Sequence, residues 1–251
     1  MKWPFFGSYM AGFLLLATAV QASEIELADD LQVRPLTDSI WLHISSVELE
    51  GYGRVAGNGL IVVGQGEAAL IDTPWTDEQV RLLFSWAGRD LGVKITMIVP
   101  THSHGDCMGG LAAAHEQGAK SVALEQTRII ARKQGLPVPT KGFEDETVLN
   151  VGDRKIWVRH LGPGHTVDNV VVWIPDEQVL FGGCLVKSAE ARGMGYIGEA
   201  NLVKWPDTLR ALESAYPEVK IIVPGHGQPG GGDLLDHTIA LVASQPGDDG
   251  S

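Results

Sequence analysis

The sequence predicts an α/β fold in which two β-sheets pack face to face and helices cover their outer sides. Short runs of β-branched residues alternate with helical stretches along the whole chain, with glycine and proline between them. No stretch has the composition of a linker between domains. Because sheets and helices must each bury one apolar face, this order favours a single domain built of two β-then-α halves.

The first half is expected to contain strands at 39–49, within 58–72, at 95–100 and at 121–124. The segment 58–72 holds two strands around the turn Gly64-Gln65-Gly66. Helices are expected at 76–91, 108–117 and 127–134. Thr76 and Gln79 form a capping box at the start of the first helix. Gly51, Gly53 and Gly57 predict a flexible hairpin loop after the first strand.

The second half repeats this arrangement. Strands are expected at 155–161, 169–174, 178–181 and 220–223. Helices are expected at 206–216 and 234–243, with Pro206 suited to a first helical position. We expect residues 245–251 to form a disordered tail.

The N-terminus has the features of a signal peptide, residues 1–22. Lys2 is its positive charge, and an apolar run follows over 9–20. This run is shorter than the roughly 20 residues that span a bilayer. Val20-Gln21-Ala22 fits a cleavage site, which predicts a mature domain of residues 23–251 in the periplasm and no later membrane attachment. An N-terminal anchor or a buried helix is the alternative.

The composition excludes several classes of function. The chain has 31 acidic and 19 basic residues and a formal net charge of −12. Nucleic acids and anionic membranes bind positive surfaces, so neither is an expected partner. A hydrophobic content of 44% is that of an ordinary globular protein. Nothing in the sequence suggests an assembly larger than a monomer.

The eight histidines divide into two groups. Four lie in predicted strands or helices, where a core or surface role is expected: His43, His115, His160 and His237. The other four lie in loops rich in glycine or serine, mostly after apolar strands: His102, His104, His165 and His226. Cys184 follows another apolar strand. Loops held by a sheet commonly carry functional groups, so these five residues and Asp106 are candidates for a site.

The spacing His102-x-His104-x-Asp106 is suited to metal binding. In an extended segment, residues two apart project the same way, so the two histidines can hold one ion. Gly105 lets the chain bend and direct Asp106 to a neighbouring ion. Imidazole, thiolate and carboxylate are zinc ligands, and six of them suit two ions that each keep room for water. We therefore expect His102, His104 and His165 on one zinc, and Asp106, Cys184 and His226 on the other. The alternative is a binding module in which these are turn residues and buried polar groups.

These motifs, with Gly-Pro-Gly-His165, Gly-Gly-Cys184 and Pro-Gly-His226-Gly, resemble the metallo-β-lactamases. The resemblance covers about residues 40–243 and includes the segments 71–75 and 166–169. It implies an αββα sandwich with the metals in a groove at one sheet edge.

The ligand types indicate the first subclass of that family. The single-zinc subclass carries asparagine in place of His102. The subclass without a cysteine ligand carries a histidine where this chain has Cys107. Hydrolases of the superfamily that act on thioesters, lactones or RNA share that histidine and carry aspartate in place of Cys184. Thioester or lactone hydrolysis, zinc sequestration without turnover and a lectin-like module are the competing interpretations.

The resemblance implies hydrolysis of penicillins, cephalosporins and carbapenems through a zinc-bound hydroxide, and hence antibiotic resistance. Asp106 would bind metal and orient water, and Lys187 would bind the carboxylate of the β-lactam. Asp72 would orient a metal ligand from beneath the site. The loop 48–55 would form a flap, with Tyr52 contacting the substrate.

The sequence departs from the family pattern at two positions. Cys107 stands where arginine is common, which removes a positive charge near the second zinc. In an oxidising compartment Cys107 could also pair with Cys184 and consume a ligand. Tyr196, expected to line the substrate site, stands where many relatives have an asparagine that polarises the lactam carbonyl.

Overall fold

The computed structural model describes residues 24–245. The signal peptide predicted over 1–22 and the tail after Gln245 lie outside this range. None of the helices in the described part has the length and apolar character needed to cross a membrane.

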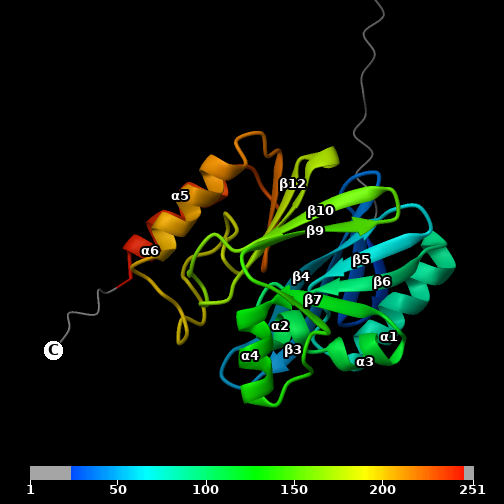
Figure 1. The fold of residues 1–251 in the computed structure, drawn as a ribbon. Helices are drawn as coiled ribbons and strands as arrows, with labels where there is room; N and C mark the ends of the chain where they lie inside the picture. The colour runs from blue at the N-terminus through cyan, green and yellow to red at the C-terminus, as the bar shows by residue number, and fades with distance from the viewer. Residues whose placement is uncertain (1–23, 246–251) are drawn as a thin grey trace, which may run out of the picture.

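Two β-sheets form the centre of the molecule (Figure 1). The larger sheet contains, in spatial order, β1 (Ile25–Ala28), β2 (Leu31–Pro35), β3 (Ile40–Leu49), β4 (Gly53–Val63), β5 (Glu67–Ile71), β6 (Lys94–Val99), β7 (Lys120–Leu124) and β8 (Lys141–Phe143). The smaller sheet has the order β13 (Ile221–Pro224), β12 (Val179–Gly183), β11 (Val171–Ile174), β10 (Arg154–Arg159) and β9 (Glu146–Val151). Strands β5 to β8 run parallel, as do β12 and β13, and the other neighbours are antiparallel.

Helices lie on the outer sides of both sheets. The larger sheet is covered by α1 (Asp77–Trp86), which continues into a π-helical turn over Ala87–Leu91, and by α3 (Leu111–Glu116). The short helices α2 (Gly105–Met108) and α4 (Glu125–Gln134) follow β6 and β7. On the opposite side of the molecule, α5 (Trp205–Ala215) and α6 (Asp233–Ala243) cover the smaller sheet (Figure 1).

Three apolar layers separate these elements. The central layer packs residues such as Leu60 and Ile71 of the larger sheet against Val172 and Phe181 of the smaller one. The two outer layers join each sheet to its helices. The predicted αββα sandwich is therefore confirmed, because each sheet buries one face against the other sheet and the opposite face under helices.

Local sequence signals explain where several elements begin. Thr76 accepts a hydrogen bond from the Gln79 amide at 3.2 Å, and the Gln79 side chain accepts one from the Thr76 amide at 3.1 Å. The predicted capping box thus starts α1. Pro206 occupies the first turn of α5, where its missing N–H has no helical partner to lose.

Some sequence expectations were wrong. The predicted loop with Gly53 and Gly57 is shorter, because both residues belong to β4. The helix expected at 108–117 is divided into α2 and α3 at Gly109, where a Cβ would lie 2.0 Å from the Trp75 carbonyl oxygen. Four strands were not predicted: β1, β2, β8 and β9.

The topology brings the candidate site residues to one edge of the sandwich. His102 and His104 follow β6, and Asp106 lies in α2. His165 lies between β10 and β11, Cys184 directly follows β12, and His226 comes two residues after the end of β13. The structure therefore gathers residues from four segments that are distant in the chain, at 102–106, 165, 184 and 226.

Candidate metal centre

Three histidines form a compact group at this edge. The Nε2 atom of His102 lies 2.9 Å from Nδ1 of His104, and Nε2 of His165 lies 3.3 Å from the same Nδ1. Their rings meet edge to face, with centroids 4.5 to 5.2 Å apart. One nitrogen of each ring therefore faces a common point, as the ligands of a single ion would.

Hydrogen bonds on the outer side of the group orient His104. Its Nε2 lies 2.8 Å from Oε2 of Glu199, so Nε2–H donates to the carboxylate. That bond leaves a lone pair on Nδ1, the nitrogen that faces His102 and His165. The His102 Nδ1 lies 3.3 Å from the Thr101 hydroxyl and 3.2 Å from the Cys107 sulfur.

A second group contains one carboxylate, one thiol and one imidazole. Oδ2 of Asp106 lies 3.2 Å from Sγ of Cys184 and 3.3 Å from Nε2 of His226. The Cys184 sulfur is 3.4 Å from that same nitrogen. These three atoms converge as the ligands of a second ion would.

The first half of the chain holds His226 in place. Its Nδ1–H donates to the Ala56 carbonyl oxygen at 2.6 Å, which leaves Nε2 free to face the site. Asn58 reinforces this junction, since its amide side chain donates to the carbonyl oxygens of Pro224 and Gly227 at 2.9 and 2.7 Å. Both halves of the chain are therefore needed to form the second group.

The two groups adjoin each other through Asp106. Its Oδ1 lies 3.9 Å from Nε2 of His102, while its Oδ2 faces Cys184 and His226. A third combination with atoms equally close together is His102, Asp106 and Cys107. Cys107 is buried and, like Cys184, is a free thiol rather than half of a disulfide.

The electrostatics favour the metal-binding protonation states. Burial alone raises the pKa of Asp106, but the hydrogen bond with His226 and the charge of His102 lower it, and the net shift is downward. A hydrogen bond from Cys107 lowers the pKa of the Cys184 thiol. Burial lowers the pKa of His165, which keeps its imidazole neutral. An ionised carboxylate, a thiolate and neutral imidazole are the forms that bind Zn²⁺.

The donor set fits zinc. The converging atoms are nitrogen, oxygen and sulfur, three in each group, and tetrahedral zinc with three protein ligands keeps a position for water. Nitrogen lone pairs that face each other at 2.9 Å repel unless a proton or a cation lies between them. The site is therefore chemically complementary to cations.

Asp72 lies below the first group and contacts it through Thr101. Its carboxylate accepts hydrogen bonds from the Thr101 amide at 2.6 Å and the Thr101 hydroxyl at 2.8 Å. Burial raises the pKa of Asp72, and these bonds oppose the shift. Asp72 has a φ of 56°, an uncommon value outside glycine, as is found at functional sites. It reaches His102 only through its neighbour in the chain.

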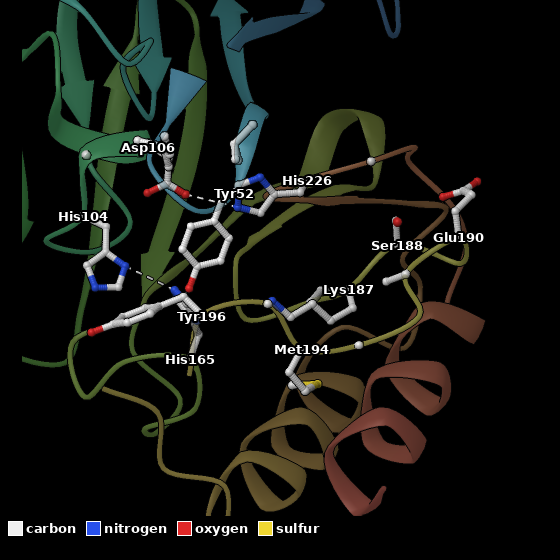
Figure 2. A pocket seen from close by; sticks show the side chains of 18 of the residues that line it. Tyr52, His104, Asp106, His165, Lys187, Ser188, Glu190, Met194, Tyr196 and His226 are labelled. Carbon is white, nitrogen blue, oxygen red and sulfur yellow. Dashed lines mark hydrogen bonds and ion pairs between the residues drawn. The ribbon is translucent and has the colours of Figure 1, made fainter. Parts of the chain in front are cut away.

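A pocket of about 620 Å³ opens over both groups. Figure 2 shows Asp106 facing His226, His104 beside His165, and the Lys187 amine directed toward these histidines. Tyr52 and Tyr196 line the opening and are 63% and 49% exposed. The Tyr196 ring lies 5.8 Å from that of His104. All the predicted site residues except buried Asp72, Cys184 and His102 line this pocket.

Lys187 is a mostly buried cation beside the metal-ligand candidates. Its Nζ lies 5.6 Å from the centre of the Trp205 ring, and in residues 24–245 no carboxylate forms an ion pair with it. Burial lowers the pKa of Lys187, and the charges of Cys184 and Asp106 oppose this shift. A buried ammonium group without an acidic partner is suited to receive an anion.

Sequence reasoning missed three residues of the site. Thr101 connects Asp72 to His102, Trp75 forms part of the pocket wall, and Glu199 contacts His104. Thr101 directly precedes the His-x-His run, so its position was a usable signal. Glu199 lies in an irregular loop 95 positions from its partner, and no sequence pattern indicates that contact.

An αββα sandwich with two adjacent three-ligand groups at one edge defines a class of protein built around a metal centre. Residues 52–226 match the family model described as the metallo-beta-lactamase superfamily. The chain belongs to this family, and zinc is the metal that the family binds.

Individual relatives agree with this assignment. The chain is 39% identical over 230 residues to metallo-beta-lactamase type 2 of Bacteroides fragilis. This alignment covers 91% of this chain and 92% of that protein. It is 35% identical over 209 residues to metallo-beta-lactamase type 2 of Pseudomonas aeruginosa, covering 83% of each. A solved metallo-beta-lactamase from Pontibacter korlensis superposes with a TM-score of 0.82 at 38% identity, covering 86% of this chain and 100% of that structure.

Proposed function

We propose that this protein hydrolyses the amide bond of β-lactams, namely penicillins, cephalosporins and carbapenems, with two bound zinc ions, and so confers antibiotic resistance. Family membership supports a zinc-dependent hydrolase of the β-lactamase type. The observation that carries the proposal is the pair of three-ligand groups beneath one pocket, with Lys187 beside them and no ion pair to that lysine within residues 24–245.

Each of the two ligand groups would bind one zinc ion. His102, His104 and His165 would hold one ion, and Asp106, Cys184 and His226 would hold the other. When bound, zinc supplies Lewis acidity and lowers the pKa of a coordinated water to about 7. Asp106 lies between the two groups, so its free oxygen can accept a hydrogen bond from the attacking water and orient it.

The pocket would bind a β-lactam by its charge and by its apolar surface. Lys187 would receive the substrate carboxylate as a point charge on a flexible stem. Trp75, Tyr52 and Met194 supply apolar wall for the substituents of the lactam. Tyr196 stands at the rim against His104, where its ring forms wall surface.

The competing activities differ in the bond that is cleaved. Cys107 stands where thioesterases and lactonases of the superfamily carry a histidine, and Cys184 replaces their aspartate. These two replacements favour lactams over thioesters and lactones. The substrate would be a small molecule, and we expect the protein to act as a monomer.

The test combines metal analysis with turnover. The purified protein is assayed for zinc content and for hydrolysis of imipenem, a chromogenic cephalosporin and a thioester, before and after chelation. We expect two zinc ions per chain, lactam hydrolysis that is lost with chelator, and recovery on addition of zinc. Zinc binding without lactam turnover, or turnover of the thioester alone, would contradict the proposal.

The proposed location is the periplasm, since the N-terminal sequence has the features of a signal peptide. Mass spectrometry of the protein recovered from an expressing bacterium tests this. Cleavage after Ala22 is expected, and a periplasmic fraction that retains Lys2 would contradict it.

A further inference from the structure

In the described structure, one segment of the pocket wall has a single polar attachment, which is a contact to a candidate metal ligand. The loop between β12 and α5 supplies Lys187, Met194 and Tyr196 to the pocket. From Arg192 to Ala200 in the described structure, the bond between Glu199 and His104 is the only hydrogen bond to a residue outside that segment. Its other attachments are apolar contacts, such as that of buried Met194.

Residues on both sides of this segment are anchored independently. The Lys187 amide donates to the Thr238 hydroxyl at 2.9 Å, and the His237 ring contacts the Ala191 carbonyl oxygen at 3.1 Å. On the other side, the Asn201 amide donates to the Gly164 carbonyl oxygen at 2.8 Å. The ends of the loop are therefore fixed without the metal centre, whereas the polar attachment of the middle depends on His104.

His104 is the ring on which the middle of the loop converges. Glu199 accepts from its Nε2 at 2.8 Å, and the ring of Tyr196 meets it edge to face at 5.8 Å. The opposite ring nitrogen, Nδ1, faces His102 and His165. One imidazole thus contacts the loop on one side and the metal position on the other.

We propose that Glu199 is a positioning residue that couples zinc binding at His104 to the placement of residues 192–200 over the pocket. This inference rests on the proposed function, since it requires zinc at the histidine group. The carboxylate fixes the His104 tautomer and ring orientation, which raises zinc affinity. Because coupling between two equilibria is reciprocal, bound zinc must in turn hold the segment that carries Tyr196.

The coupling has a consequence for the pocket. When His104 is released from zinc, its ring gains freedom, and the single polar attachment of residues 192–200 weakens. Glu199 is 43% exposed at its side chain, so water can replace His104 as its partner. Bound metal would therefore fix the position of residues 192–200, which in its absence keep only their apolar contacts.

Two measurements test this on the full-length mature protein. Competition with a chromophoric chelator gives zinc affinity, and hydrogen–deuterium exchange of peptides covering 192–200 gives loop protection with and without zinc. The variants are Glu199→Ala and Glu199→Asp. Glu190→Ala is the matched control, because Glu190 lies in the same loop and lines the same pocket without contacting a candidate ligand.

We expect Glu199→Ala to weaken zinc binding by about tenfold or more, the usual effect of removing a partner of a metal ligand. At saturating zinc it should lose the zinc-dependent protection of 192–200 that the unmodified protein shows. Glu199→Asp should recover part of both properties, and Glu190→Ala should change neither.

The inference is overturned if Glu199→Ala keeps zinc affinity within twofold, or if zinc protects the loop equally in that variant. It is also overturned if zinc does not protect the loop of the unmodified protein. Failure of the unmodified protein to bind zinc would instead contradict the proposed function, so the two failures are distinguishable.

Discussion

The Sγ atom of Cys184 lies 3.2 Å from Oδ2 of Asp106, although 78 positions separate these residues in the chain. The contact completes the second ligand group, and it makes Cys184 rather than Cys107 the expected thiolate ligand. We predict that Cys184→Ser removes one of two zinc ions and most of the lactam turnover. Elemental analysis and an imipenem assay measure both effects.

Cys107→Ser is the matched control, since both sulfurs are buried near His102 or Asp106. It should retain both ions. The opposite result, with metal lost only from Cys107→Ser, would assign the second ion to His102, Asp106 and Cys107.

Lys187→Ala should raise KM for carboxylate-bearing lactams about tenfold or more and change kcat less. Such a loss corresponds to roughly 1.4 kcal/mol, the order expected for one hydrogen bond to a charged group. Steady-state kinetics provide the measurement, with Lys204→Ala, an exposed lysine beyond the pocket, as the control. An unchanged KM would remove Lys187 from substrate binding.

Gly225→Ala should weaken binding of the second zinc ion, although residue 225 is not one of its ligands. A Cβ at this position would lie 2.5 Å from the Cys184 sulfur and 2.7 Å from the Cys184 amide nitrogen. Either the sulfur or the backbone must move, which predicts weaker zinc binding and a loss of about 1–3 kcal/mol in unfolding free energy. Chelator competition and urea unfolding measure the two quantities.

Gly232→Ala is the comparison, because a Cβ there meets nothing within 4 Å. It should preserve zinc affinity. Equal zinc affinity in the two variants would show that the Cys184 position tolerates displacement.

We predict that the folded protein loses stability in mild acid because of buried His43. Burial lowers the pKa of His43 from 6.5 to about 4 in the folded protein. The unfolded chain therefore binds the proton first, and stability that is complete above pH 6.5 falls as the pH decreases toward 4. The loss across this window is on the order of 3 kcal/mol.

Urea unfolding of the chelated protein at several pH values checks this, so that zinc release does not contribute. His43→Asn should be less stable at pH 7 and should show a flatter pH dependence. Parallel pH profiles for the two proteins would contradict the role of His43.

Much of the fold could be predicted from local patterns. The capping box of Thr76 and Gln79 and the turn at Gly64-Gln65-Gly66 were correctly located. The unpredicted strands β1 and β8 have four and three residues, too few to show periodicity. Their extended conformation depends on pairing with β2 and β7.

The order of residue types along the chain was sufficient to determine the ligand candidates, because imidazole, thiolate and carboxylate after strand ends have few other uses. Only the tertiary structure decided how these groups are oriented. The Ala56 carbonyl orients the His226 ring, and Glu199 orients the His104 ring. Thr101 contacts both Asp72 and His102. Such contacts join residues from separate strands and loops. They depend on how these segments pack in three dimensions, so the sequence carries no periodic signal for them.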